Sequence, residues 1–248
     1  IHFIHSKSFF SLVDMFINIT AIRLSDEVLA DSISSSEKRQ NLTNKSIKVI
    51  SFKLFNDVKM KRKKIGGKLK FMFLGRISKV KNLSLSITII EKLFLNGYNV
   101  ILDIYGPKED DYNHLVSLVN KKNLNDIVNF KSELKSKEVK DVFDNYNFYL
   151  QTSNSEGMGM SVVEAMMNGL VCLIKPVGEM KNYSEDMISA IHLKSSADIN
   201  EFIKKIIICI ENPEIYSSIS LNAMKQFKNK STYSESMNDY LIDMLKKN

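Results

Sequence analysis

Residues 147–174, NFYLQTSNSEGMGMSVVEAMMNGLVCLI, are the stretch that most constrains the fold of this chain. Phe148–Gln151 is a short apolar run that predicts a buried strand, and a loop of turn-forming residues follows it. Met160–Met167 predicts a helix that ends at Asn168-Gly169, because glycine tolerates a left-handed backbone after the last turn. A second apolar run, 170–174, predicts another strand. Open α/β sheets bind ligands in such loops, at the carboxyl ends of their strands.

The loop between that strand and helix carries groups that suit an extended ligand with an anionic group and several hydroxyls. Gly157 and Gly159 lack a Cβ atom, so a ligand can approach the backbone closely. The free N–H groups at the start of the helix favour an anion such as a phosphate. Glu156 and Glu164 can accept hydrogen bonds from two hydroxyl clusters of one extended ligand. The alternative is that both carboxylates are solvated, but the flanking glycines and the apolar helix favour a binding site.

Residues 74–83, LGRISKVKNL, follow the predicted strand Leu69–Leu74 and form a second candidate site. Gly75 permits a tight turn, and Arg76 and Lys81 flank the entry to the next helix. These two cations suit a diphosphate, because arginine can bind phosphate oxygens in pairs and lysine acts as a point charge. On its own the pattern is weak, since surface arginines and lysines are common.

Both stretches resemble one enzyme family. Residues 155–170 resemble the E-x7-E segment of the large retaining nucleotide-sugar glycosyltransferase class with the GT-B fold (glycosyltransferase family 4), and GRISKVK resembles its G-R-x4-K site. The resemblance implies that Glu156 contacts the donor sugar and Glu164 holds the ribose hydroxyls. It also implies backbone contacts to the sugar and diphosphate, and cationic contacts to the diphosphate. The implied residues are Gly157, Met158, Gly159 and Met160 for the backbone contacts, and Gly75, Arg76 and Lys81 for the diphosphate.

The order of elements predicts an α/β fold of GT-B type. One complete carboxyl-terminal, donor-binding Rossmann-like domain is expected, together with a partial Rossmann-like amino-terminal domain, because the resemblance implies that the first part of the acceptor-side domain is absent from this sequence. The expected divisions are a partial acceptor-side domain over 1–55, a linker over 56–68, a nucleotide-sugar-binding domain over 69–232 and a crossover helix over 233–248.

Within the nucleotide-sugar-binding domain, strands alternate with helices. The predicted strands are Leu69–Leu74, Val100–Tyr105, 127–130, Phe148–Gln151 and Val171–Ile174, and the predicted helices are 82–95, 112–122, 136–145, 160–168, 197–211 and 214–227.

The first part of the chain predicts strands over 1–6, 26–31 and 47–52. Phe9–Leu24 predicts an amphipathic helix rather than a membrane span, because it is short and interrupted by polar residues. A serine-rich turn is expected before a helix over 37–43. By the resemblance, His5 falls where many members of the family carry an active-site histidine that lines the sugar cleft; the alternative is an ordinary hydrogen-bonded histidine.

Two positions depart from the family pattern. Lys131 and Ser132 stand where a glycine is usual in a loop that borders the nucleobase, which leaves the base open between UDP and GDP types. The turn Val177-Gly178-Glu179-Met180 replaces a usual Gly-Gly-x-x-E turn, which leaves the sugar contacts there open.

Composition narrows the class of protein. Hydrophobic residues make up 44% and charged residues 25% of the chain, as in soluble globular proteins. Cys172 and Cys209 lie in apolar runs and predict buried free thiols in a reducing compartment, hence a cytoplasmic protein. No cysteine or histidine pair has metal-ligand spacing, and no signal peptide is recognised.

The net charge of +7 is partly local, because basic residues cluster over 59–70. The cluster is interpreted as a solvated linker, with peripheral contact to an anionic membrane surface as the alternative. Nucleic acid is not expected, since no recognition motif accompanies it.

The sequence therefore predicts a glycosyltransferase that moves a hexose-type sugar from a nucleoside-diphosphate sugar to a glycan or lipid-linked acceptor, in polysaccharide biosynthesis, with retention of configuration and without a metal or other cofactor. The alternatives are a non-catalytic nucleotide-binding fragment and a GT-B sugar-nucleotide epimerase. A nicotinamide dehydrogenase would need G-x-G-x-x-G after the first strand of the domain, which LGRISKVKN lacks.

Overall fold

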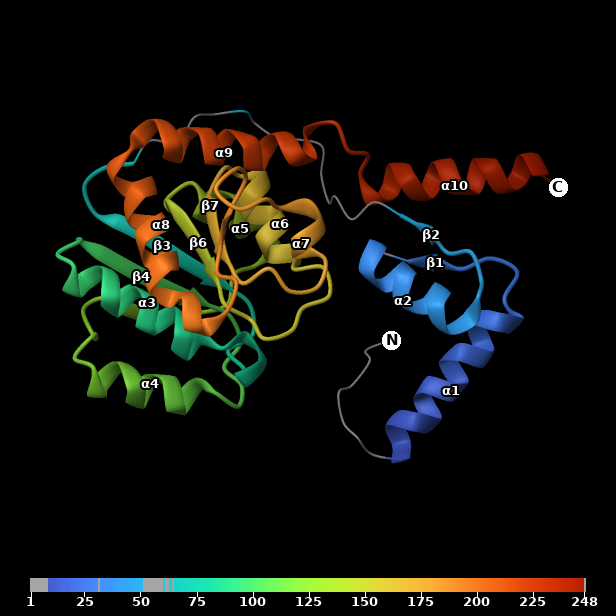
Figure 1. The fold of residues 1–248 in the computed structure, drawn as a ribbon, viewed down its shortest axis with the longest axis horizontal. Helices are drawn as coiled ribbons and strands as arrows, with labels where there is room; N and C mark the ends of the chain where they lie inside the picture. The colour runs from blue at the N-terminus through green and yellow to red at the C-terminus, as the bar shows by residue number, and fades with distance from the viewer. Residues whose placement is uncertain (1–8, 31, 51–59, 61–62, 64, 248) are drawn as a thin grey trace. The chain divides into compact units, whose positions relative to one another are not determined.

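The computed structural model describes residues 9–30, 32–50, 60, 63 and 65–247. These residues form two compact units (Figure 1). The larger unit lies within Phe55–Lys230, and the smaller combines residues from Ile1–Leu54 with Ser231–Asn248.

The larger unit is built on a six-stranded sheet in which every pairing is parallel. Its strands are β3 (Leu69–Leu74), β4 (Val100–Tyr105), β5 (Val128–Lys131), β6 (Phe148–Gln151), β7 (Val171–Ile174) and β8 (Ile191–His192). The helices between and after them are α3 (Leu83–Leu95), α4 (Tyr112–Lys121), α5 (Ser136–Phe143), α6 (Met160–Met167), α7 (Met180–Tyr183), α8 (Ile199–Glu211) and α9 (Pro213–Lys228), with short 3-10 turns η1 (Lys79–Lys81) and η2 (Ser196–Asp198).

The strand order is β5-β4-β3-β6-β7-β8, which gives the sheet one topological switch point. From β3 the chain adds β4 and β5 on one side, then returns to place β6 on the other side of β3, where Phe71 pairs with Phe148 and Met72 with Tyr149. Helices α3 and α4 cover one face and α5 and α6 the other (Figure 1). In open α/β sheets, ligands bind beyond the carboxyl ends of the strands at such a point. Here that position lies between the loops that follow β3 and β6.

The central strands are buried because helices cover both faces. The whole of β6 and β7 is buried, and the rings of Phe71 and Phe148 stack 4.7 Å apart between neighbouring strands. Such continuous apolar strands are typical of parallel sheets and give the loops at their ends a rigid base. Cys172 and Cys209 are buried free thiols, as predicted. Burial raises the pKa of Cys209 to about 12, so this thiol stays protonated.

The smaller unit contains α1 (Phe9–Leu24), β1 (Leu29–Ala30), α2 (Ile33–Thr43), β2 (Lys48–Val49) and α10 (Tyr233–Lys247). The two strands pair in parallel, and Ser36 Oγ donates to the carbonyl of Ile47 at 3.1 Å. The Lys48 ammonium lies 5.0 Å from the Tyr240 ring centre and 3.7 Å from Asp243, which joins β2 to α10.

Most predicted elements of the larger unit are confirmed within two residues at their ends. Strand β8 and helix α7 were not predicted, because a two-residue strand and a single helical turn are too short for a periodic pattern. In the smaller unit, the strand expected over 26–31 is reduced to Leu29–Ala30. The predicted serine-rich turn is wrong: the Ser32 hydroxyl accepts from the Ser35 amide and caps α2, which begins at Ile33.

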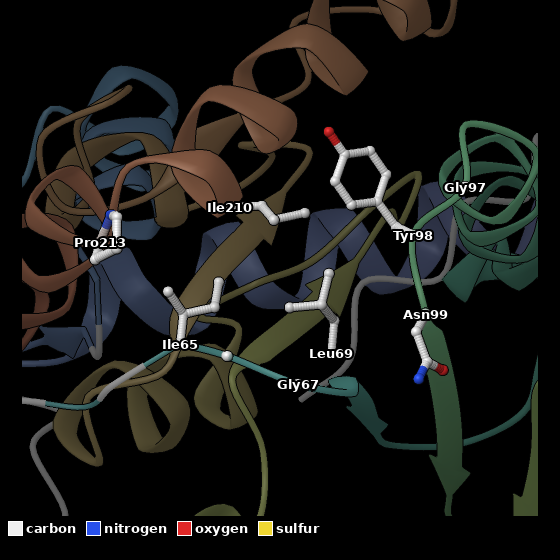
Figure 2. Close-up of a pocket in the computed structure, with 9 residues that line it drawn as sticks. Ile65, Gly67, Leu69, Gly97, Tyr98, Asn99, Ile210 and Pro213 are labelled. Carbon is white, nitrogen blue, oxygen red and sulfur yellow. The ribbon is translucent and has the colours of Figure 1, made fainter.

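One cavity lies at the opposite edge of the sheet from the switch-point loops. It has a volume of about 260 Å³ and sits where β3 and β4 begin, beside Leu69 and Asn99 (Figure 2). Its wall includes Ile65, Tyr98 and Ile210. Because the carboxyl ends of the strands lie at the other edge, this cavity is separate from the site described below. None of the helices in the described ranges is long and apolar enough to cross a membrane.

Candidate donor-binding site

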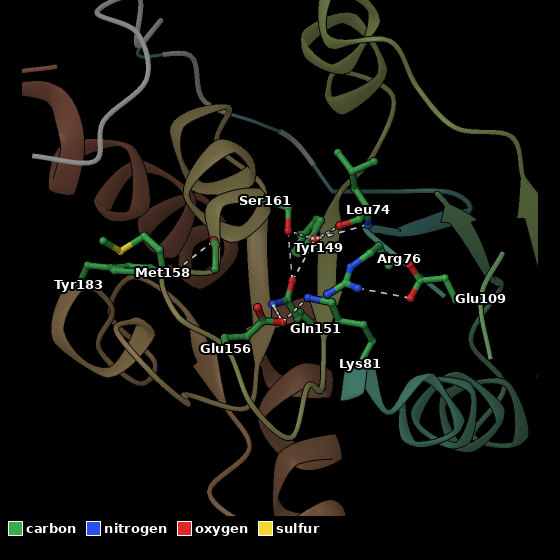
Figure 3. Close-up of polar contacts among 11 residues, drawn as sticks. Leu74, Arg76, Lys81, Glu109, Tyr149, Gln151, Glu156, Met158, Ser161 and Tyr183 are labelled. Carbon is green, nitrogen blue, oxygen red and sulfur yellow. Dashed lines mark hydrogen bonds and ion pairs between the residues drawn. The ribbon is translucent and has the colours of Figure 1, made fainter. Parts of the chain in front are cut away.

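The two motifs meet at the switch point of the sheet. Strand β3 leads into the loop with Lys81, its neighbour β6 leads into the loop with Glu156, and the Lys81 Nζ lies 2.6 Å from Glu156 Oε1 (Figure 3). Both side chains are largely buried, with 16% and 11% of their surfaces exposed. A charge pair shielded from water interacts more strongly than a surface pair. The structure therefore joins residues 75 positions apart in the sequence into one polar site.

The backbone of the β6–α6 loop presents unused amides. None of the amides of residues 155–161 donates a hydrogen bond to another residue in the described part of the chain. Gly159 has a left-handed φ of 66° and turns the chain directly into α6. A run of unpaired amides that ends at a helix start attracts anions, because each N–H carries partial positive charge and the helix dipole adds to it. Gly157, Met158, Gly159 and Met160 all lie in this run.

Backbone carbonyl groups of the same loop accept hydrogen bonds from the segment around α7. The Glu179 amide donates to the Gly157 carbonyl at 2.9 Å, and the Tyr183 hydroxyl donates to the Met158 carbonyl at 2.9 Å. Gly178, at φ 61°, lies so close that a Cβ there would be 2.2 Å from the Glu156 carbonyl oxygen. The turn over 177–180, which departs from the family pattern, thus contacts the β6–α6 loop through the carbonyl groups of that loop. In the sequence Gly178 is indistinguishable from an ordinary turn residue, and its role follows from this close approach.

A buried network holds the Glu156 carboxylate from the strand side. Gln151, the last residue of β6, is 1% exposed, and its Nε2 donates to Glu156 Oε1 at 2.9 Å. Its Oε1 lies 3.1 Å from the Tyr149 hydroxyl and 3.3 Å from Ser161 Oγ, which are 2.8 Å from each other (Figure 3). Burial raises the pKa of Tyr149, so it remains a neutral hydroxyl. No local motif predicts this network, and the one sequence signal for it is an amide side chain at the end of an apolar strand.

On the β3 side, Gly75 and Arg76 occupy the turn that precedes η1. Gly75 adopts φ 156° and packs against Gly106, the residue after β4, where a Cβ would be 2.0 Å from the Gly75 carbonyl oxygen. Two facing glycines therefore let the β3 and β4 loops approach each other. Arg76 is well exposed and reaches Glu109 at 3.5 Å, a weak pair that leaves its guanidinium accessible.

Glu164 lies in the middle of α6, and its side-chain carboxylate has no hydrogen-bond or ion-pair partner among the described residues. It is partly buried, and burial raises the pKa of its carboxyl group. A half-buried carboxylate without a donor is unfavourable unless a ligand supplies one. Its position on the helix that follows the amide run fits the predicted contact with a second hydroxyl cluster.

Other residues that the sequence singled out lie outside the described residues or in a third loop. His5 and most of the basic cluster over 59–70 lie outside the described residues. Lys131 ends β5 and lies 3.8 Å from Asp103, at the same edge of the sheet as the other loops. Within the described ranges, no three His, Cys, Asp or Glu side chains gather closely enough to hold a metal ion.

Comparisons with solved structures find the same fold in proteins that were solved with UDP. The structure of a TarM mutant from S. aureus, bound to Fondaparinux, alpha-GlcNAc-glycerol and UDP, matches with a TM-score of 0.75 at 18% identity, over 93% of this chain and 45% of that one. Anabaena HepE with UDP matches with a TM-score of 0.83 at 18% identity, over 100% and 71%. The pneumococcal O-GlcNAc transferase GtfA with UDP and GlcNAc matches with a TM-score of 0.72 at 17% identity, over 93% and 47%.

The sequence identifies the family. Residues 55–226 match Glycosyl transferases group 1, and the chain belongs to this family. No curated protein matches the sequence significantly. The chain spans less than half the length of TarM and GtfA.

Proposed function

We propose that this chain is the donor-binding part of a retaining glycosyltransferase of family 4, which transfers a hexose-type sugar from a nucleoside-diphosphate sugar to a glycan or lipid-linked acceptor. The observation that carries the proposal is the meeting of Lys81 and Glu156 beside the unpaired amides of 155–161. The Lys81 ammonium and the amides can bind a diphosphate, and the Glu156 carboxylate can accept hydrogen bonds from the hydroxyls of the attached sugar. Membership of the glycosyltransferase family supports the same assignment.

The donor is proposed to be a UDP-sugar, with a GDP-sugar as the alternative. TarM, HepE and GtfA were each solved with UDP, and this chain has the same fold. Glu164 would accept hydrogen bonds from the ribose hydroxyls, and Arg76 with Lys81 would hold the diphosphate. Gly75 and the amides of Gly157 and Gly159 would allow the phosphates to approach the backbone.

The site chemistry fits transfer without a metal ion. The bond between the anomeric carbon and the diphosphate oxygen breaks, and a bond from that carbon to an acceptor oxygen forms. The acceptor proton passes to the leaving phosphate. Negative charge that develops on the diphosphate would be stabilised by the amide run and Arg76, and by Lys81 once the donor draws its ammonium away from Glu156. Glu156 would orient the sugar, and no role as a nucleophile is assigned to it.

The setting of the reaction is also proposed. The acceptor side would include residues 1–55, with a linker over 56–68 and residues 233–248 as the crossover helix. We propose that the protein works in the cytoplasm in polysaccharide biosynthesis, with the basic cluster over 59–70 drawing it to anionic membrane surfaces.

Calorimetric titration and product analysis test this function. The purified chain is titrated with UDP, GDP and ADP, and then incubated with the sugar form of the nucleotide that binds. Binding followed by transfer to an added glycan supports the proposal. Binding without any turnover supports a nucleotide-binding protein, and turnover of the donor without an acceptor to an isomeric sugar nucleotide supports an epimerase. If no nucleotide binds, the proposal is wrong.

A further inference from the structure

The Glu156 carboxylate is held in an asymmetric way. Its Oε1 accepts from both Lys81 Nζ, at 2.6 Å, and Gln151 Nε2, at 2.9 Å. Its Oε2 accepts no hydrogen bond from another described residue. One oxygen is therefore anchored by two donors and the other is available to a ligand hydroxyl.

The two donors differ in what a ligand would do to them. Lys81 is a flexible cation that would also attract a diphosphate, so a bound donor competes with Glu156 for its ammonium. Gln151 is neutral, fully buried and on a rigid strand, so a diphosphate has no comparable effect on its amide. The hydrogen bond from Gln151 is the one that can keep Glu156 in place when Lys81 turns to the phosphates.

The orientation of the Gln151 amide is itself fixed. Its Nε2 faces a carboxylate oxygen, and its Oε1 faces two hydroxyls, those of Tyr149 and Ser161. The reversed amide would place its oxygen against the negative Glu156 carboxylate, which is electrostatically unfavourable, whereas the two hydroxyls could accept from an N–H as well as donate to an oxygen. The Tyr149 hydroxyl has a single proton and lies 3.0 Å from the Leu74 carbonyl, so when it donates there, Ser161 Oγ is the donor to Gln151 Oε1, at 3.3 Å.

From this geometry we propose that Gln151 is a positioning residue for sugar recognition, which holds Glu156 in register with the donor sugar while Lys81 binds the diphosphate. The inference rests on the proposed function of Glu156. It assigns to the end of β6 a specificity role: Gln151 acts on the sugar half of the donor and has no effect on the nucleotide half. The ligand class is a nucleoside-diphosphate hexose.

The test compares two affinities of the full chain by calorimetry, that for UDP and that for UDP-glucose or UDP-N-acetylglucosamine, whichever binds wild type more tightly. Gln151→Leu replaces the amide with an apolar side chain of similar size and removes the hydrogen bond to Glu156. We expect UDP-sugar affinity to fall about tenfold, the effect of one hydrogen bond to a charged group. We expect UDP affinity to change less than twofold. Thr152→Val is the control, because Thr152 follows Gln151 in the chain and the substitution removes its hydrogen bonds to Ser86 and Asn82. This variant should lower the affinities for UDP and for the UDP-sugar equally, or lower neither.

A second variant gives a signature that loss of stability would not. Gln151→Glu places a second carboxylate beside Glu156, and two close carboxylates ionise together only at a cost, so they share a proton more readily as the pH falls. UDP-sugar affinity of this variant should rise from pH 8 to pH 5.5, whereas wild type changes little, because the diphosphate of a UDP-sugar keeps its charge over this range.

The outcomes separate the two proposals. If UDP binds but Gln151→Leu loses UDP and UDP-sugar affinity equally, or loses neither, the positioning role is refuted while the donor site stands. The positioning role is also refuted if the UDP-sugar affinity of Gln151→Glu does not change between pH 8 and pH 5.5. If neither UDP nor a UDP-sugar binds wild type, the donor site itself is refuted, and the role of Gln151 falls with it.

Discussion

Replacing Glu164 by glutamine should improve the stability of the fold and weaken nucleotide binding at the same time. The carboxylate is partly buried without a partner, and burial raises its pKa. The folded state therefore binds this proton more tightly than the unfolded state does. The protonated Glu164 carboxyl group contributes its full stabilisation below the ordinary carboxyl pKa. This stabilisation is lost as the pH rises through the raised pKa of the folded state. Glu164→Gln removes this loss, so the variant should melt above wild type at pH 7.5, and the difference should close at about pH 4.

The effect on binding has the opposite sign. If Glu164 accepts from the ribose hydroxyls, exchanging a charged acceptor for a neutral one costs about 1.5 kcal/mol, or about tenfold in the Kd for UDP. Glu214→Gln, an exposed carboxylate in the first turn of α9, serves as the control and should leave the Kd unchanged. Thermal melting across pH and calorimetry with UDP measure both effects. A variant that melts below wild type at pH 7.5, or binds UDP equally well, would refute the reasoning.

Three further predictions concern the two loops. Lys81→Met should weaken UDP about tenfold or more and UMP far less, because a charge-assisted contact to the second phosphate is lost; equal losses in the two titrations would contradict this. Glu156→Ala should leave UDP affinity undiminished, since Lys81 loses a competing partner, and should lower UDP-sugar affinity and transfer; a parallel loss of UDP binding would count against the division of roles. Gly106→Ala should cost about 1–3 kcal/mol of stability through backbone strain, because its Cβ would meet the Gly75 carbonyl at 2.0 Å, whereas Gly66→Ala, with open space around it, should melt like wild type; equal melting temperatures for the two variants would refute the steric argument.

The sequence predicts the larger unit well because its strands are short, apolar and separated by periodic helices. Strands β3, β4, β6 and β7 lie where the apolar runs predict them. The sequence also contains both motifs of the site, but it does not specify that β6 pairs with β3. Strand order is a property of the whole sheet, and only the switch point explains why Lys81 and Glu156 meet.

The residues that sequence reasoning missed act through tertiary contacts rather than through a local motif. The sequence indicates only that Gln151 ends an apolar strand, and its hydrogen bond to Glu156 is apparent only in the structure. Gly106 and Gly178 read as ordinary turn residues, yet each is required by a backbone approach from a distant loop. Helix α7 has too few residues for a pattern, although its Tyr183 hydroxyl fastens the Met158 carbonyl. Glu156 was expected to face a sugar, and its pairing with Lys81 adds a competing partner that no spacing rule indicates.

The central claim is that the loops after β3 and β6 form one binding site for a nucleoside diphosphate. Calorimetric titration of the purified chain with UDP, GDP and ADP, repeated on Glu164→Ala, tests it most directly. The account predicts that one of the nucleotides binds at a single site and that the variant binds it at least tenfold more weakly, the loss of charged hydrogen bonds to the ribose. Absence of binding by all three, or binding that is unchanged in the variant, would contradict it.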